Sequence, residues 1–225
     1  MMSRIRRLLE RHLKIYPKVP KNANFKKGFL FIHIPKNAGS SLGNILGINL
    51  PSHLYLRDFQ NRILPEHFAA LKVIAVVRNP WERFLSLYNY ARMDVSYYHN
   101  NIDPENSQFG IHEDYQVLKD ASLIECAHLL TQGALKHSHP NTQWNPQSEW
   151  LKNNDGELAT AHFLGRLETL NDTISDLEDL IGPLPPLQHV NRSTEQDYHD
   201  LLDLETKKII TAYYEEDIDN FKYTY

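Results

Sequence analysis

The stretch FIHIPKNAGSSLG, residues 31–43, predicts a strand that turns through a short loop into a helix. Its first residues are apolar apart from His33, and the small residues after Lys36 are turn-formers that suit the start of a helix. Such residues let backbone N–H groups approach a ligand, and the N-terminus of the helix adds positive potential. With Lys36 at its mouth, the loop is typical of a binding site for a phosphate-like anion.

The order of residues in this loop excludes two common nucleotide-binding patterns. A Walker loop, G-x-x-x-x-G-K-[ST], carries its lysine at the far end, whereas Lys36 precedes the small residues. The G-x-G-x-x-G fingerprint of dinucleotide-binding proteins is also missing. Taken alone, the loop therefore fits either an anion site or a plain strand-to-helix connection with an incidental lysine.

A second strand-to-helix junction is predicted within residues 71–92. LKVIAVV, residues 71–77, is almost continuously apolar, as expected of a parallel strand that is covered on both faces. The start signals of the following helix agree with one another. Asn79 suits the N-cap, Pro80 suits the first helical position, and Glu82 stands at the third position of a capping-box variant.

This junction places polar side chains where an α/β sheet binds its ligands. Arg78 ends the strand, at the carboxyl edge of the predicted sheet. Ser86 lies on the polar side of the helix, opposite an apolar face that begins at Trp81. An arginine fork and a serine hydroxyl can together hold a second phosphate. Two anion sites at two such junctions indicate a ligand with phosphate-type groups at both ends.

The remaining pattern predicts an α/β fold. Residues 28–33 form the first predicted strand, the segment ATAHFLGRLETL contains another, and residues 170–181 and 203–218 are expected to be helical. Strands that alternate with helices imply a central parallel β-sheet flanked by helices. At 225 residues, the chain fits one domain, residues 28–225, after a basic N-terminal arm, residues 1–27.

The net charge of −4 conceals two oppositely charged parts of the chain. Residues 1–27 carry nine Lys and Arg against Glu10, a charge of +8, whereas residues 28–225 carry 15 against 27 Asp and Glu, a charge of −12. The acidic body argues against nonspecific nucleic-acid binding. Apolar residues of the arm recur at helical spacing, which fits either a helix docked on its own domain or peripheral contact with an anionic surface or a partner.

Cysteine content and hydropathy limit the class of protein further. The single cysteine, Cys126, excludes an internal disulfide framework and any multi-cysteine zinc site. No run of about 18 apolar residues is present, so no transmembrane helix is expected. The basic N-terminus lacks the apolar stretch of a secretory signal. These features predict a soluble cytoplasmic protein.

The two junctions resemble parts of a known enzyme family. FIHIPKNAGSS resembles the 5′-phosphosulfate-binding loop of sulfotransferases that use 3′-phosphoadenosine 5′-phosphosulfate (PAPS), and VIAVVRNPWERFLSLYNY resembles their 3′-phosphate-binding strand and helix. Together they are similar to the carbohydrate sulfotransferase branch that includes the heparan-sulfate 2-O-sulfotransferases and smaller bacterial relatives. The blocks NPQSEWL, FLGRLETL, LQHVNRST and YYEEDIDNFKYTY follow in the same order as in the bacterial members. The resemblance covers nearly the whole chain from about residue 28, and it implies the P-loop-NTPase-like sulfotransferase fold.

The resemblance also implies roles for individual residues. Lys36 would contact the 5′-phosphosulfate and stabilise the leaving group, while Arg78 and Ser86 would bind the 3′-phosphate. The residues implied to cradle the 5′-group through backbone and hydroxyl donors are Asn37, Ala38, Gly39, Ser40 and Ser41. The loop that closes over the nucleotide supplies the further cofactor-binding candidates Asn191, Arg192 and Ser193. Arg166 is either another support of the nucleotide or part of a structural ion pair with Glu168 or another acid.

Sulfuryl transfer also needs a base that takes the proton of the acceptor hydroxyl. His53 is the candidate, because it lies in the irregular stretch where the family places a histidine, followed here by Arg57. An unperturbed histidine titrates near neutrality, although a single histidine is more often a surface or core residue. The rival, His33, alternates with isoleucines on its strand, which favours a packing role beneath the loop. His137 and His139 have no third ligand near them, so no metal is expected.

The implied function is therefore in-line transfer of a sulfuryl group from PAPS to a hydroxyl, with Lys36 and the loop amides aimed at the departing oxygen and no metal required. Two alternatives stay open: a P-loop-type nucleotide kinase, and a non-catalytic nucleotide- or glycan-binding module. The expected acceptor is an oligosaccharide or glycoconjugate. Aromatic residues of 93–112 and 137–151, among them Trp144 and Trp150, are expected either to shape its pocket or to pack as core or lid.

Overall fold

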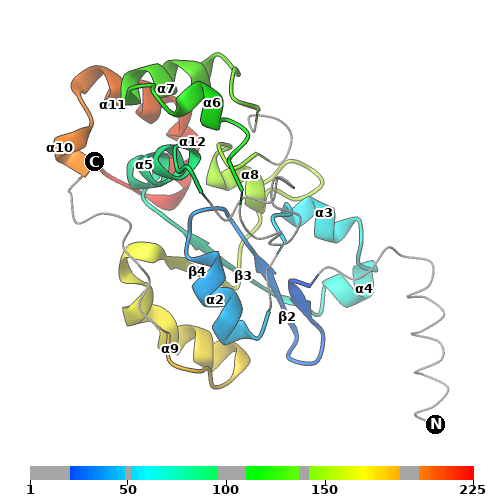
Figure 1. Cartoon of the computed structure of the whole chain (residues 1–225). Coiled ribbons are helices and arrows are strands. Elements are labelled where there is room, and N and C mark those ends of the chain that lie inside the picture. The colour runs from blue at the N-terminus through cyan, green and yellow to red at the C-terminus, as the bar shows by residue number, and fades with distance from the viewer. Residues whose placement is uncertain (1–20, 49–51, 96–109, 137–141, 188–197) are drawn as a thin grey trace, which may run out of the picture.

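A four-stranded sheet forms the centre of the part of the chain that the computed structural model describes, residues 21–48, 52–95, 110–136, 142–187 and 198–225. The strands are β1 (Ala23–Asn24), β2 (Phe29–Ile32), β3 (Lys72–Val77) and β4 (Phe163–Arg166), and they follow one another in this order across the sheet (Figure 1). β2, β3 and β4 are parallel, whereas β1 pairs antiparallel with β2. The carboxyl ends of the three parallel strands therefore meet at one edge of the sheet.

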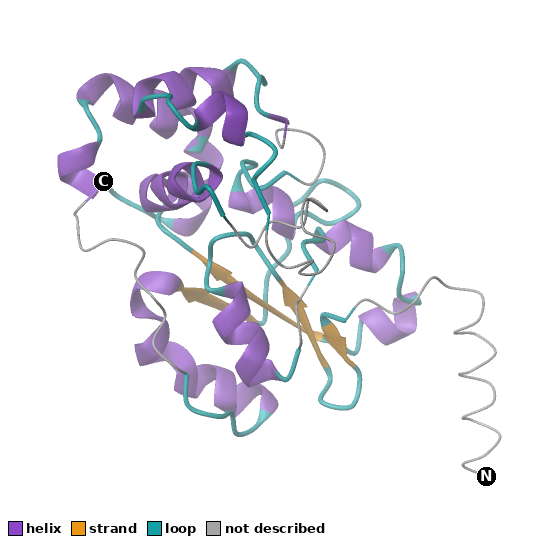
Figure 2. Ribbon diagram, viewed as in Figure 1, coloured by secondary structure: helices purple, strands orange, loops and turns teal. Residues whose placement is uncertain are grey.

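Helices cover both faces of this sheet (Figure 2). They are α2 (Gly39–Leu46), α3 (Leu56–Gln60), α4 (Pro65–Phe68), α5 (Pro80–Ala91), α6 (Tyr115–Leu118), α7 (Leu123–Thr131), α8 (Gln147–Leu151), α9 (Leu170–Ile181), α10 (Tyr198–Leu201), α11 (Leu204–Tyr213) and α12 (Glu215–Phe221), with a 3₁₀ turn at Leu167–Thr169. The expected α/β fold, with a mostly parallel central sheet between helices, is confirmed.

Two hydrophobic cores result from the alternation of side chains along the strands. Phe29 and Phe31 of β2 pack with Ile74 and Val76 of β3 against α2 and α9 on one face. The alternate residues of the same strands pack against α3, α5, α7, α8, α11 and α12 on the other face. Both faces are buried, as the near-continuous apolar sequence of the second strand predicts. Burial of both faces stabilises the pairing of β2 with β3, so the ends of these two strands lie next to each other.

Most predicted element boundaries are close to the observed ones, but the C-terminal helix is not. The segment expected to form one helix over 203–218 forms α11 and α12, which are separated at Tyr214. Tyr214 is fully buried, and its hydroxyl donates a hydrogen bond to the Trp144 carbonyl oxygen at 2.8 Å. The bend at this position lets the two short helices pack against different neighbours, because α11 contacts α7 and α5 while α12 contacts α8.

The last residues of the predicted basic arm belong to the sheet. Ala23 and Asn24 pair with Leu30 and Phe29 of β2. The side chain of the preceding Asn22 is buried, and its amide donates hydrogen bonds to carbonyl oxygens of β2 and of Ser52 at 2.9 Å. This short strand satisfies backbone groups on one edge of β2 that would otherwise lack partners. Residues 1–20 of the arm lie outside the described residues.

Candidate active site

The loop between β2 and α2 holds its backbone in an uncommon conformation. Lys36 and Ala38 have positive φ angles of 69° and 56°, in the left-handed region that residues with a side chain rarely adopt. Ala38 is also the N-cap of α2, and a methyl group cannot accept hydrogen bonds from the first N–H groups of a helix. The first N–H groups of α2 therefore have no side-chain cap, and backbone of alternating conformation is the kind that forms anion-binding concavities.

Gly39 is required at the start of α2 by the ring of His33. A β-carbon at this position would lie 1.7 Å from His33 Nε2, far inside the van der Waals contact distance. His33 is buried and stacks on Phe31, with 5.8 Å between the ring centroids. The His33 ring therefore packs directly beneath the loop at Gly39. This agrees with the packing role that the sequence favours for His33.

The side chain of Asn37 ties the same loop to the rest of the fold. It is buried, and its amide nitrogen donates to the Val76 carbonyl oxygen at 2.8 Å and to Gln147 Oε1 at 2.6 Å. Its side-chain N–H groups are thus used within the protein, so the donors that Asn37 can offer to the cradle are those of its backbone. Ser40 is exposed and Ser41 half-buried in the first turn of α2, so their hydroxyls stay accessible.

The second junction places Arg78 beside the first loop. Arg78 follows the last residue of β3, and its Nη1 lies 3.4 Å from the carbonyl oxygen of Lys36. Nε and Nη2 lie 3.4 Å and 3.3 Å from Glu82 Oε2, one helical turn further on. The two strand-to-helix junctions are therefore in direct contact, with one cation at each.

At the start of α5, the predicted N-cap is confirmed but the predicted capping box is not. Asn79 is the N-cap, and its side-chain oxygen accepts from the backbone N–H groups of Trp81 and Glu82. The predicted return bond from Glu82 to the N-cap is wrong, because the carboxylate pairs with Arg78 instead. The backbone N–H of Asn79 donates to Glu168 Oε1 at 2.5 Å. A neighbouring guanidinium attracts the carboxylate more strongly than a neutral amide does.

Two polar residues of α5, Arg83 and Ser86, have buried side chains. Ser86 follows Glu82 by four residues, which places it on the same helix face as the Arg78–Glu82 pair. Arg83, three residues before Ser86, is almost fully buried. Its guanidinium donates to the carbonyl oxygens of Pro35, Gln143 and Asn145, at 3.1, 2.6 and 3.0 Å. It therefore fastens α5 to the segment just before Lys36, a role that the sequence did not reveal.

Lys36 lies near an aromatic ring and a second cation. Its Nζ is 4.2 Å from the centroid of the Tyr90 ring, whose negative face attracts an ammonium group. Burial, followed by repulsion from Arg78, lowers the pKa of Lys36 from 10.5 to about 8. The ammonium is therefore still charged at neutral pH, but at a cost in free energy that a nearby anion would remove.

His53 lies next to the loop as well. Its ring centroid is 4.2 Å from that of His33 and 6.3 Å from that of Trp150. Desolvation by the surrounding protein, followed by His33 and Lys36, lowers the pKa of His53 from 6.5 to about 3. His53 also has an exposed surface, and solvent on that side moderates the first of these effects. His33 and Lys36 lower the pKa of His53 in the same direction, so the imidazole is neutral at physiological pH.

Arg57, the other residue predicted near His53, has a different partner. Its Nη1 lies 3.4 Å from Glu149 Oε2, and its guanidinium lies over the Tyr55 ring, 4.3 Å from the centroid. The structure therefore brings Lys36, Arg78, His33 and His53 together and directs Arg57 to α8.

Arg166 contacts the C-terminal segment rather than Glu168, the acid named as its possible partner. Its guanidinium donates to the Phe221 carbonyl oxygen and lies 4.8 Å from the centroid of the Tyr223 ring. Glu168 accepts from the Asn79 backbone and from the Tyr223 hydroxyl. Both residues thus hold the C-terminal segment against the sheet. The cofactor-binding candidates Asn191, Arg192 and Ser193, and the histidines His137 and His139, lie outside the described residues.

Trp144 and Trp150 belong to the core rather than to an open pocket. Both side chains are fully buried, and Trp144 Nε1 donates to Asp114 Oδ2 at 3.1 Å. The expectation that they shape an acceptor pocket is wrong for these two residues. Aromatic side chains in a polar, proline-broken segment suit a sugar surface and a core equally well, and only their burial distinguishes the two.

Within the described ranges, no group of three or more His, Cys, Asp and Glu side chains is arranged to hold a metal ion. In the same ranges, no helix has the length and hydropathy needed to cross a membrane.

The fold and the site together define an α/β protein with two cationic strand-to-helix junctions in contact at the carboxyl edge of its sheet. Residues 23–224 match the Sulfotransferase family, so the chain belongs to this family. No curated protein and no solved structure matches the chain in the same comparisons. Family membership over nearly the whole chain supports sulfuryl transfer as the general activity.

Proposed function

We propose that the protein transfers a sulfuryl group from PAPS to a hydroxyl of a carbohydrate acceptor. The observation that carries this proposal is the contact between the Lys36 loop and Arg78, which puts two cations at the ends of neighbouring strands. PAPS carries a phosphosulfate at its 5′ end and a phosphate at its 3′ position, so it has one anionic group for each junction. A heparan-sulfate 2-O-sulfotransferase-like enzyme of the small bacterial type is the proposed branch, and an oligosaccharide or glycoconjugate is the proposed acceptor.

The residues of the first junction fit the 5′-phosphosulfate. The first N–H groups of α2 have no side-chain cap, and Gly39 keeps the backbone free of a β-carbon at this point. Ser40 and Ser41 add accessible hydroxyl donors, and Lys36 adds a charge. In the proposed site these groups stabilise the negative charge that develops on the oxygen leaving toward the nucleotide.

The residues of the second junction fit the 3′-phosphate. Arg78 offers the fork, and Ser86 lies on the same face of α5. Glu82 shares the Arg78 guanidinium through contacts of 3.3 and 3.4 Å, and among the described residues Nη1 has one long contact of 3.4 Å, to a carbonyl oxygen. A phosphate with two charges competes well for such a partly engaged guanidinium.

His53 is the proposed base. It is neutral at physiological pH, so it can accept a proton from the acceptor hydroxyl as the hydroxyl oxygen forms its bond to sulfur. The bond between sulfur and the 5′-phosphate oxygen breaks in the same step, and the electron pair leaves on that oxygen beside Lys36. The negative charge of the donor, once bound, favours the protonated imidazole and makes His53 a stronger base than it is in the free protein.

Nucleotide binding gives the most direct test of the two-anion site. Calorimetry is expected to show tighter binding of adenosine 3′,5′-bisphosphate than of ATP–Mg²⁺. Arg78→Ala is expected to weaken binding of the bisphosphate by roughly 10- to 100-fold, because it removes a charge-assisted contact, and to leave adenosine 5′-phosphate almost unaffected. Tighter binding of ATP–Mg²⁺ would instead favour a kinase, and an equal loss for both adenosine ligands would contradict the role of Arg78.

The pH dependence of the same binding tests Lys36. Only the charged ammonium attracts the anion. Binding therefore takes up a proton once the pH exceeds the pKa of Lys36 in the protein without ligand, which is about 8. The bisphosphate should therefore bind about tenfold more weakly at about pH 9 than at about pH 7. Lys36→Arg is the control, because a guanidinium stays charged across this range. A wild-type affinity that is constant across this range would contradict the prediction.

The acceptor is accessible to a direct screen. Incubation with labelled PAPS and a library of oligosaccharides, lipids and small alcohols is expected to label a carbohydrate. Binding of the bisphosphate without labelling of any hydroxylated acceptor would favour a non-catalytic binding module.

A further inference from the structure

We propose that Gln147 is a positioning residue that fixes the separation of the two anion-binding junctions. It belongs to neither junction, because it begins α8, and its side chain is fully buried. The inference rests on the proposed two-anion ligand. It adds a residue that determines how far apart the two anionic groups of that ligand must be. In the sequence, Gln147 lies in the block NPQSEWL, where nothing in the residue pattern assigns it a function.

The Gln147 amide contacts both junctions at once. Its Oε1 accepts from Asn37 Nδ2 at 2.6 Å and from the Arg78 backbone N–H at 2.8 Å. Its Nε2 donates to the Arg78 carbonyl oxygen at 2.8 Å. The orientation of the amide is unambiguous, because a backbone N–H can only donate and a carbonyl oxygen can only accept. One side chain thus joins the first loop to the backbone of the residue that carries the second cation.

Gln147 is itself held from a third direction. Its backbone N–H donates to Asp217 Oδ2 at 2.6 Å, and the backbone N–H and hydroxyl of Ser148 donate to Oδ1 at 2.7 and 2.8 Å. Asp217 lies fully buried on α12. The position of the Gln147 amide is therefore set by the C-terminal helix rather than by either loop, so it can act as a fixed reference for both.

Such a link matters because both loops have already left the sheet. β2 ends at Ile32, five residues before Asn37, and β3 ends just before Arg78. A ligand with two anionic groups gains affinity from the second site only when the two sites are held at the matching distance. Without Gln147, the loops keep the bonds from Asn37 to Val76 and from Arg78 to Lys36, so each site survives while their separation becomes less well defined.

The test compares a ligand that reaches both junctions with one that reaches a single junction. Gln147→Met has a similar length and no hydrogen-bonding groups. This substitution is expected to weaken binding of adenosine 3′,5′-bisphosphate roughly tenfold and to leave the affinity for adenosine 5′-phosphate nearly unchanged. In this background, Arg78→Ala should cost less bisphosphate affinity than it costs in the wild type, because the second site no longer contributes fully. A merely structural role would weaken both ligands in parallel and leave the effect of Arg78→Ala unchanged.

Two further variants keep the experiment decisive. Ser148→Ala removes a hydroxyl from the same buried network without any bond to the loops, so it should lower thermal stability and leave the ratio of the two affinities intact. Gln147→Glu keeps the accepting oxygen and puts a second oxygen in place of the donor to the Arg78 carbonyl, and it replaces Gln147→Met if that variant does not fold. If the wild type prefers the bisphosphate and every folded Gln147 variant keeps that preference, the role of Gln147 is overturned. If the wild type shows no preference, the two-anion site itself is refuted, and this inference with it.

Discussion

Replacing Lys36 by alanine is expected to lower the rate of sulfuryl transfer by about 10²–10³-fold. The ammonium lies half-buried at the mouth of the α2 loop, where water screens it poorly. A charge in this position acts mainly on the transition state, because the negative charge on the departing oxygen grows as the bond to sulfur breaks. Transfer of labelled sulfate from PAPS to the acceptor identified by screening is the measurement, with turnover and Michaelis constant determined separately.

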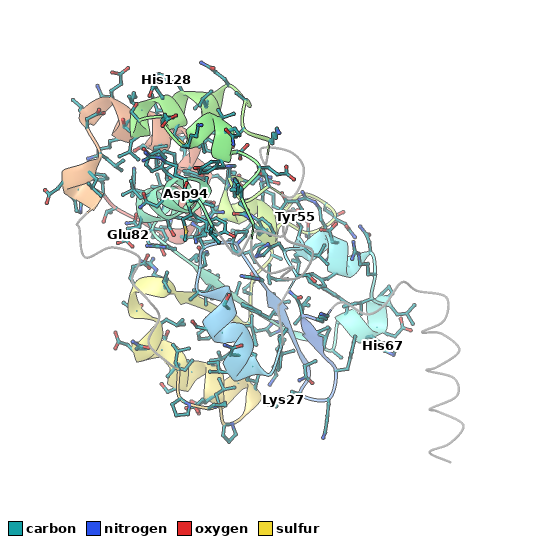
Figure 3. All side chains as sticks on the ribbon, in the orientation of Figure 1. Lys27, Tyr55, His67, Glu82, Asp94 and His128 are labelled. Carbon is teal, nitrogen blue, oxygen red and sulfur yellow. The ribbon has the colours of Figure 1, made fainter. Side chains whose placement is uncertain are left out.

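Two controls make the Lys36 result specific. Lys27→Ala removes one positive charge from an exposed turn at the opposite end of β2, and it should leave turnover unchanged (Figure 3). Lys36→Arg should recover part of the rate, since it keeps the charge but replaces a compact ammonium with a planar fork. Turnover in Lys36→Ala within a few-fold of the wild type would exclude Lys36 from the catalytic step and leave it a role in binding only.

The site combines several features that each cost free energy. Two residues with side chains adopt left-handed backbone conformations, the N-terminus of α2 has no side-chain cap, and Lys36 is partly desolvated beside Arg78. The pKa of Lys36 is about 8 in the folded protein and 10.5 in the unfolded chain. Between these two pH values the unfolded chain therefore binds more protons than the folded protein. Stability should therefore rise with pH in this window, and the penalty is present in full below it. An anion would accept from the uncapped N–H groups and offset the cost of the desolvated ammonium.

Local signals in the sequence were sufficient for the two junctions. The apolar runs before Pro35 and Arg78, the small residues after Lys36 and the Asn79–Pro80 start of α5 each act within a few residues. Parallel pairing of β2 with β3 then follows from their burial on both faces, and it brings the two junctions to the same edge. These local signals therefore account for the contact between Arg78 and the Lys36 loop.

The supports of the site depend on contacts that no local pattern encodes. Gln147 is 110 residues from Asn37 and 69 from Arg78 in the sequence, and Arg83 binds carbonyl oxygens about as distant. A glutamine in an irregular polar segment and an arginine on an amphipathic helix both look like surface residues. Their burial is possible only because the fold supplies a complete set of hydrogen-bonding partners, which the sequence of either segment does not reveal.

Replacing His53 by alanine is expected to lower turnover by about 10²–10⁴-fold, the usual contribution of a positioned base. The imidazole lies against His33 beside the Lys36 loop and is neutral, so its removal should change nucleotide affinity little. Because His53 has an exposed surface, added imidazole should enter the space left by the ring and restore part of the rate. His128→Ala, on the exposed face of α7, is the matched control and should change nothing (Figure 3).

The pH profile separates the role of His53 as a base from a role in packing. Only the neutral imidazole accepts the proton, so kcat/KM should fall as the pH drops through its pKa in the free protein, which is about 3. We therefore expect kcat/KM to show no loss attributable to His53 between about pH 7 and about pH 5, whereas kcat should begin to fall at a higher pH because the bound donor raises the pKa of the imidazole. In His53→Ala this limb of kcat should disappear and return with imidazole. Undiminished turnover in His53→Ala would remove His53 as the base.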